Sequence, residues 1–372
     1  MPNLFAANTL ARFWGTGQQV AQEAWLAAAR SAAECLPGGA EVMDRAGWNG
    51  LAEHILGEGQ FGPERYRLSR ARRLYYQLRP FLPRRATALV RRAGQRTSAE
   101  SFPLGWPIED RFVRFMYAVR ERSGASATRP FWPDNAPFAF VLTHDVERAD
   151  GQAFVETVAR LDEQFGFRSS FNFVPDDYTV DQGVTGDLQV RGFEVGIHGL
   201  KHDGKLFSSR SGFERAAKRI ALHAHTLGAV GFRSPATHRN PEWMQDLDVE
   251  YDSSFFDTDP YEVMPGGTMS IWPFFCGRFV ELPYTLAQDH TLVTVLGEQT
   301  PRLWLEKLEF IAQWGGMALV NVHPDYLRVG VNWRVYEQFL QHMQSLRERC
   351  AYWHALPREV ARWWRTRADA IG

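Results

Sequence analysis

The feature that most constrains this chain is a repeated alternation of strand and helix patterns that begins at Pro137. Short, nearly continuous apolar runs lie at 138–144, 168–175, 193–198, 231–235, 280–284 and 317–323. Helical periodicity separates many of them, at 151–164, 211–227, 301–314 and 332–349, and a further strand and helix follow around 350–366. This alternation predicts a parallel sheet, whose strands are buried on both faces. About 235 residues suit one barrel, so we assign 137–372 to a single α/β unit, a (β/α) barrel.

The part of the chain before the barrel has a different texture. Residues 1–63 repeat apolar residues at three- and four-residue spacing, which predicts a helical N-terminal segment. Residues 64–136 read as an Arg-rich helical extension and a Pro-rich linker, with one helix near 108–122. The composition is 45% hydrophobic and 13% aromatic, which excludes a disordered chain. The net charge of −1 excludes a whole-chain nucleic-acid binder, so we expect no nucleic-acid partner.

Ionisable residues follow four of the predicted strands. They are Asp145, Glu147, His198, His202, Arg233 and His323. In β/α barrels the carboxyl ends of the strands carry the chemistry, because all of them meet at one face. We therefore expect these side chains to lie close together.

Each of these groups also has a simpler interpretation. His198 and His202 are four residues apart, which suits a shared metal ion, although two exposed loop histidines show the same spacing. Of Asp145 and Glu147, one can ligate a metal while the other acts as a general base, or both can belong to a turn. His323 can donate a proton near neutral pH or be a buried, hydrogen-bonded histidine. The coincidence at four strand ends favours a metal-dependent hydrolytic site.

Five segments between about 137 and 366 resemble, in the same order, the motifs of the polysaccharide deacetylases of the NodB-homology type (carbohydrate esterase family 4). They are residues 143–147, 198–202, 233–235, 251–255 and 319–323. The resemblance implies a distorted (β/α) barrel with a mainly helical N-terminal extension. Weaker similarity at 74–85 and around Trp106 resembles extensions of such deacetylases in surface-polysaccharide gene clusters.

The same resemblance implies a role for each motif residue. Asp145 would be the catalytic base, and Glu147, His198 and His202 would be the metal ligands. Arg233 would orient the base and His323 would be the catalytic acid. Asp252, from the fourth motif, would lie near His323 or Arg233 and tune the protonation.

The sequence departs from the family pattern at two positions. The ligating acid is usually Asp, but here Val146 occupies the adjacent position and Glu147, which is one methylene longer, must take the role. Gly199 stands where the family usually has Ser or Thr, and this position supplies no ligand.

The activity that the resemblance implies is metal-dependent hydrolysis of an acetamido group on a sugar, a reaction at a carbon–nitrogen bond other than a peptide bond. The setting would be biosynthesis of a bacterial surface polysaccharide such as O-antigen, capsule or exopolysaccharide. The cofactor would be a divalent metal, most simply Zn²⁺, with Co²⁺, Ni²⁺, Mn²⁺ or Fe²⁺ as alternatives. Two other functions stay open: a catalytically impaired barrel that binds carbohydrate, and a deformylase or other hydrolase of linear C–N amides.

Aromatic side chains near the motifs are candidates for substrate contact, since sugars stack on aromatic faces. The residues are Trp243, Trp272, Tyr284 and Tyr326. Packing in the core is the alternative for each one.

The Arg-rich stretch suggests where the protein acts. Residues 64–96 hold eleven Arg and one Glu. They can pair with the acidic barrel or contact an anionic membrane surface, with Leu and Tyr at the interface. Three widely spaced cysteines and no apparent signal peptide favour the cytoplasm. We therefore expect a cytoplasmic protein, with the inner face of the membrane as a site of peripheral contact, whose partner is an acetylated sugar or polysaccharide precursor.

Overall fold

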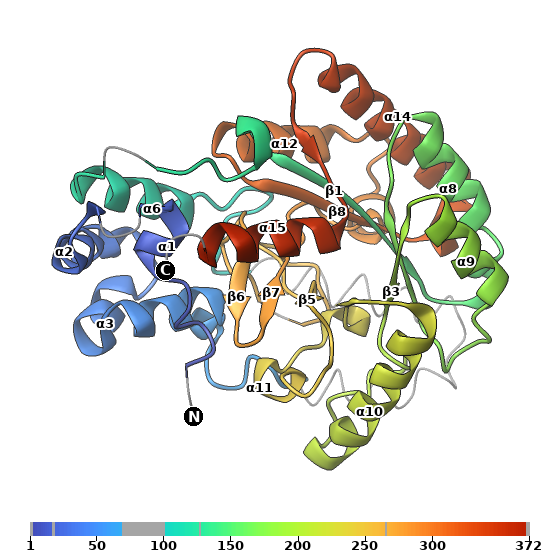
Figure 1. The fold of residues 1–372 in the computed structure, drawn as a ribbon, viewed down its shortest axis with the longest axis horizontal. Coiled ribbons are helices and arrows are strands. Elements are labelled where there is room, and N and C mark those ends of the chain that lie inside the picture. The colour runs from blue at the N-terminus through green and yellow to red at the C-terminus, as the bar shows by residue number, and fades with distance from the viewer. Residues whose placement is uncertain (1–2, 17–18, 69–100, 126–127, 265, 370–372) are drawn as a thin grey trace.

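The computed structural model describes residues 3–16, 19–68, 101–125, 128–264 and 266–369. Among them, nine strands form one curled sheet in the order β6-β7-β5-β4-β3-β2-β1-β8, with β9 paired to the beginning of β1 (Figure 1). Every pairing is parallel except that of β6 with β7. The strands are β1 (Ala139–Val146), β2 (Ser170–Phe173), β3 (Glu194–Ile197), β4 (Gly231–Phe232), β5 (Tyr251–Asp252), β6 (Phe274–Cys276), β7 (Phe279–Glu281), β8 (Met317–Val322) and β9 (Trp353–His354).

Helices follow the strands, as the alternation in the sequence predicts. They are α7 (Ala149–Gln152), α8 (Val155–Gln164), α9 (Gln182–Val190), α10 (Arg210–Leu227), α11 (Pro241–Met244), α12 (Arg302–Gln313), α13 (Pro324–Leu327), α14 (Gly330–Arg347) and α15 (Pro357–Asp369). Helix α10 shows why these segments are helical. The Ser209 hydroxyl caps its first turn, Gly228 ends it in a left-handed conformation, and its buried residues recur every three or four positions.

The N-terminal helices gather at the β6 edge of the sheet (Figure 1). They are α1 (Leu10–Trp14), α2 (Gln22–Ala32), α3 (Gly39–Leu56) and α6 (Arg111–Arg122), which confirms the helices predicted in 1–63 and near 108–122. The Asn8 side chain satisfies both backbone groups of Phe275 on β6, at 2.7 and 2.8 Å. The extension thereby covers an edge strand that would otherwise expose unpaired backbone groups.

A fully buried ion pair also joins the extension to the barrel. Glu58 follows α3, and its carboxylate accepts hydrogen bonds from Arg239, in the loop after β4, and from the backbone N–H of Gly267. Both charged side chains are 0% exposed. The Arg239 guanidinium also lies over the rings of Phe255 and Phe256. The sequence motifs gave no indication of this contact.

Two predictions from the sequence, the membrane contact and the domain boundaries, are not addressed by these contacts. Most of the Arg-rich stretch, from residue 69 to 96, lies outside the described residues, so its proposed membrane contact stays a prediction. The domain boundaries at 63 and 136 also stay predictions. Within the described ranges, none of the helices combines the length and the apolar character needed to cross a bilayer.

Candidate active site

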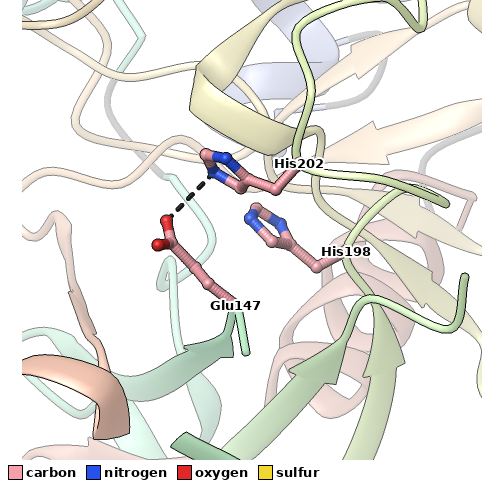
Figure 2. A group of neighbouring side chains, drawn as sticks. All are labelled: Glu147, His198 and His202. Carbon is pink, nitrogen blue, oxygen red and sulfur yellow. Dashed lines mark ion pairs between the residues drawn. The ribbon is translucent and has the colours of Figure 1, made fainter. Parts of the chain in front are cut away.

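The carboxyl ends of β1 and β3 bring three candidate metal ligands together (Figure 2). Glu147 follows β1, and His198 and His202 lie in the loop after β3. One potential ligand atom from each of the three residues lies within 4.8 Å of the others. Two of these atoms, His202 Nε2 and Glu147 Oε1, are 3.0 Å apart.

The His198 ring is oriented for metal binding. Its Nδ1 lies 3.1 Å from the backbone oxygen of Arg233, which suits a proton on Nδ1 and leaves the lone pair on Nε2. That Nε2 atom is buried and has no hydrogen-bond partner among the described residues. Burial lowers the pKa of His198 to about 4, so the imidazole is neutral at pH 7. Two imidazoles and one carboxylate are donors that suit Zn²⁺ or a similar ion.

The turn between the two histidines explains one departure from the family pattern. Gly199 has a φ of 66°, in the left-handed region that glycine adopts most readily. A Cβ at this position would lie 2.6 Å from the Pro235 ring. The close approach of the loops after β3 and β4 therefore favours glycine here.

Asp145 lies beside these ligands and is held on both carboxylate oxygens. Its Oδ1 accepts from Asn172 at 2.8 Å and from Arg233 at 3.4 Å, and its Oδ2 accepts from Asn321 at 2.8 Å. Burial alone would raise the pKa of Asp145. The His198 imidazole, which is charged only at the low pH where Asp145 titrates, and the Arg233 guanidinium hold that pKa at about 2. The side chain is thus an ionised acceptor, the state that a general base needs. The Arg233 guanidinium lies beside the Asp145 carboxylate, where the resemblance to the deacetylase motifs places it.

His323 follows β8 and is held by a residue that the motifs did not identify. Asp289 Oδ1 lies 2.6 Å from His323 Nδ1, and Asp289 Oδ2 accepts the backbone N–H of His323. Burial by itself would lower the pKa of His323, but the Asp289 carboxylate raises it to about 10. His323 Nε2 lies 4.0 Å from Glu147 Oε1, so the ring reaches the ligand group in the protonated form that a general acid needs.

The expected position of Asp252 is wrong. The pairing of β4 with β5 places Asp252 opposite Phe232 and Tyr251 opposite Gly231. Arg233 therefore shares its side of the sheet with Ser253, to which it donates two hydrogen bonds. Asp252 points to the other side and pairs with the Glu281 carboxyl group. In the described part of the chain no hydrogen bond or ion pair links it to Arg233 or His323.

The four aromatic candidates divide into two groups. Tyr326 is half-buried with its ring 5.1 Å from that of His323, and Trp243 is half-buried against Phe207. These two keep exposed surface at the carboxyl-terminal face of the sheet.

The other two candidates are core residues. Tyr284 is 1% exposed and packs on Phe256. Trp272 is 0% exposed, and its indole donates to the oxygen of Gly315, just before β8 and hence at the opposite end of the barrel. The expected substrate contact is therefore wrong for Trp272, and burial removes Tyr284 as a stacking surface.

The arrangement combines three functions at one end of the barrel. Glu147, His198 and His202 offer a three-ligand set, Asp145 offers an ionised base, and His323 offers a proton donor. A three-ligand metal site with an adjacent base and acid can activate water for hydrolysis of an amide or ester.

The fold, although not the sequence as a whole, is similar to known proteins. No protein-family model and no curated protein matches this chain. The crystal structure of a candidate polysaccharide deacetylase from Mycobacterium smegmatis matches at 18% identity with a TM-score of 0.51, covering 63% of this chain and 92% of that chain. A second candidate polysaccharide deacetylase, from Pseudomonas aeruginosa PAO1, matches at 16% identity with a TM-score of 0.50, covering 65% and 96%. These similarities confirm the predicted fold, a distorted (β/α) barrel.

Proposed function

We propose that this protein is a metal-dependent hydrolase that removes the acetyl group from an acetamido sugar. The observation that carries the proposal is the convergence of Glu147, His198 and His202 beside an ionised Asp145 and a protonated His323. The fold shared with two candidate polysaccharide deacetylases supports an acetylated carbohydrate as the substrate class.

The residues divide the hydrolytic work between them. A divalent metal held by Glu147, His198 and His202 would lower the pKa of water and polarise the amide carbonyl. Asp145 accepts the proton of the attacking water, while Asn172 and Asn321 keep its carboxylate in place. As the C–N bond breaks, the proton on His323 passes to the leaving amine, and the carbon retains the new oxygen as acetate.

The finer identity of the substrate is part of this proposal. We assign the activity to a bacterial surface polysaccharide or its precursor, because residues 74–85 and the segment around Trp106 resemble extensions of deacetylases from such gene clusters. The half-buried rings of Tyr326 and Trp243 supply surfaces on which a sugar ring can stack.

Metal content and acetate release test the proposal together. The purified chain, loaded with Zn²⁺ and in parallel with Co²⁺ or Ni²⁺, is incubated with N-acetylated and O-acetylated oligosaccharides, and free acetate and free amine are measured. We expect one bound metal per chain and equal amounts of acetate and amine from the N-acetylated substrates. Release of acetate without amine would assign an ester as the substrate.

Two other outcomes correspond to the alternative functions. Metal binding with release of formate or ammonia, but no acetate, would favour hydrolysis of a formamide or another linear amide. No metal and no product with any ion would contradict the enzymatic proposal and favour a barrel that binds carbohydrate.

A further inference from the structure

The segment 285–289, which follows β7, runs alongside β8. At its beginning, the Thr285 hydroxyl donates to one backbone oxygen of β8 at 2.6 Å and accepts one backbone N–H of β8 at 3.1 Å. At its end, the Asp289 carboxylate accepts the backbone N–H of His323 at 3.1 Å. Gln288 lies between these two attachments and is therefore held beside the end of β8.

The Gln288 amide contacts Asn321, one of the two asparagines that hold Asp145. Asn321 Nδ2 donates to Gln288 Oε1 at 3.0 Å and to Asp145 Oδ2 at 2.8 Å. The register of β1 and β8 pairs Asn321 with Thr143, which lies two residues before Asp145 and shares its face of the sheet. An amide nitrogen has two protons, so both protons of Asn321 Nδ2 have an acceptor, and one acceptor is the proposed base.

Glu262, in the loop after β5, holds the other end of the Gln288 amide. Gln288 Nε2 donates to Glu262 Oε1 at 2.6 Å, and the Thr237 hydroxyl, from the loop after β4, donates to Glu262 Oε2 at 3.2 Å. Glu262 is 7% exposed. Because a carboxylate only accepts hydrogen bonds, Glu262 selects the orientation in which the Gln288 nitrogen faces it and the Gln288 oxygen faces Asn321.

The oxygen end of the Asn321 amide is held less firmly than the nitrogen end. The Thr143 hydroxyl lies 3.2 Å from Asn321 Oδ1 and 3.0 Å from the backbone oxygen of Val320. A hydroxyl has one proton to donate, so these two oxygens share it. The two acceptors at the nitrogen end, Gln288 and Asp145, therefore determine how the Asn321 amide is oriented.

Two consecutive residues of this segment contact the two halves of the proposed site. Gln288 is linked to Asp145 through Asn321, and Asp289 Oδ1 lies 2.6 Å from His323 Nδ1. Asn321 and His323 are two residues apart at the end of β8, in extended backbone, so their side chains lie on one face. The same short segment thereby holds both the proposed base and the proposed acid.

We propose that Gln288 and Glu262 are positioning residues for hydrolysis. Glu262 orients the Gln288 amide, and Gln288 holds the Asn321 nitrogen where it donates to Asp145. The assignment rests on the proposed function, because Asp145 is the base of that reaction. Gln288 and Glu262 act through Asn321, and neither of them exchanges a proton with the substrate.

The first test removes the Gln288 amide and keeps the length of the side chain. In the metal-loaded full chain, Gln288→Met should lower kcat for acetate release by about 10-fold and change KM by about twofold at most, because a small misorientation of the base affects the chemical step. Gln245→Met is the matched control. Gln245 is also half-buried, and its amide is hydrogen-bonded at both ends, to the oxygen of Pro241 and the N–H of Arg278. An equal kcat in the two variants would overturn the assignment.

Two variants of Glu262 test whether it acts by orienting Gln288. Glu262→Gln should retain kcat within about threefold, because its oxygen can accept from Gln288 while its nitrogen donates to the Thr237 hydroxyl. Glu262→Ala should reproduce the loss seen in Gln288→Met. Because the two residues act in series, the double variant should lose no more than Gln288→Met alone. A wild-type kcat in Glu262→Ala, a Gln variant as impaired as the Ala variant, or losses that multiply in the double variant would each overturn the role of Glu262.

A measurement that needs no substrate separates this inference from the proposed function. With ¹⁵N-labelled asparagine in the Zn²⁺-loaded full chain, the Asn321 side-chain amide signals are assigned by their absence in Asn321→Asp. They should shift or broaden in Gln288→Met and stay unchanged in Gln245→Met. If the wild-type protein releases no acetate, the proposed function fails, but these signals still test the contact between Gln288 and Asn321. Unchanged Asn321 signals in Gln288→Met would overturn the positioning role, whatever the activity.

Discussion

Two pairs of buried carboxyl groups on the same sheet differ in their state of protonation. Asp145 and Glu147 lie at the end of β1, where the His202 charge holds the pKa of Glu147 well below its usual value against the opposing effect of burial. Asp252 and Glu281 lie side by side on β5 and β7. Burial and the charge of Asp252 raise the pKa of Glu281 well above its usual value.

The difference shows that burial alone does not decide the charge of a carboxyl group. Asp145 accepts from Arg233 and two asparagine amides. The Asp252 and Glu281 carboxyls instead face each other, with Ser254 and the backbone N–H of Phe255 as donors. Two facing carboxylates repel each other, so the pair retains a proton. The Asp145–Glu147 pair is therefore suited to metal binding and proton transfer, whereas the Asp252–Glu281 pair is suited to packing inside the protein.

The largest expected effect is on turnover. Asp145→Asn should lower acetate release by at least about 100-fold, since it removes the proton acceptor, while bound metal is retained. Glu281→Gln should leave turnover close to wild type. Near-wild-type turnover in Asp145→Asn would show that the role of the base is assigned to the wrong residue.

Substitutions at the metal ligands should also distinguish the Asp145–Glu147 pair from the Asp252–Glu281 pair, because only the first lies at the proposed metal site. Glu147→Gln and His198→Ala each remove one ligand. Loss of a group that only hydrogen-bonds to a ligand typically weakens metal binding by roughly 10- to 100-fold, and we expect a larger loss in these two variants. The Glu281→Gln variant should still bind one equivalent of metal per chain. Metal analysis after gel filtration measures this, and a full equivalent in His198→Ala would contradict the ligand assignment.

A further buried carboxylate, Glu58, tests what a counter-charge contributes to stability. Glu58→Gln leaves the fully buried Arg239 without a charged partner and should lower the free energy of unfolding by about 3 kcal/mol. Glu64→Gln is the control, because Glu64 pairs with Arg67 at the exposed surface. Chemical denaturation followed by circular dichroism measures both, and equal midpoints would contradict the structural role of Glu58.

The Asp289–His323 pair predicts a change in the pH profile. Asp289→Asn removes the carboxylate that raises the pKa of His323 to about 10. The alkaline limb of kcat, where His323 loses its proton, should therefore move to lower pH, and kcat at neutral pH should fall by about 10-fold. If the alkaline limb of kcat in Asp289→Asn lies at the same pH as in the wild type, a group other than His323 is the general acid.

The smallest effect concerns the pH dependence of stability. Because the folded pKa of Glu281 lies above its unfolded value, its contribution is complete below that unfolded value and is lost as the pH rises toward the folded one. Each such proton contributes a slope of about 1.4 kcal/mol per pH unit. The Glu281→Gln variant should therefore lose less stability than the wild type as the pH rises through this range. Parallel stability curves for the variant and the wild type would contradict a proton held by this pair.

The chain's periodicity was sufficient to predict the long elements. The eight-residue β1, the six-residue β8 and the helices α10, α12 and α14 all lie where apolar runs and helical spacing indicate them. The two-residue strand β5 is too short to show which way its side chains face, and this is why the position expected for Asp252 was wrong. Trp272 was misplaced because proximity to a motif in sequence does not indicate which end of the barrel a residue occupies.

The sequence by itself determined the type of barrel and the residues at its strand ends, because strand periodicity and the rule that strand ends carry function are local patterns. Only the tertiary structure showed that Asp289 holds His323, that Asn172 and Asn321 hold Asp145, and that Gln288 and Glu262 lie behind Asn321. These contacts join segments from different strands and loops, and their protonation depends on burial and neighbouring charge. Neither condition exists until the strands are placed side by side.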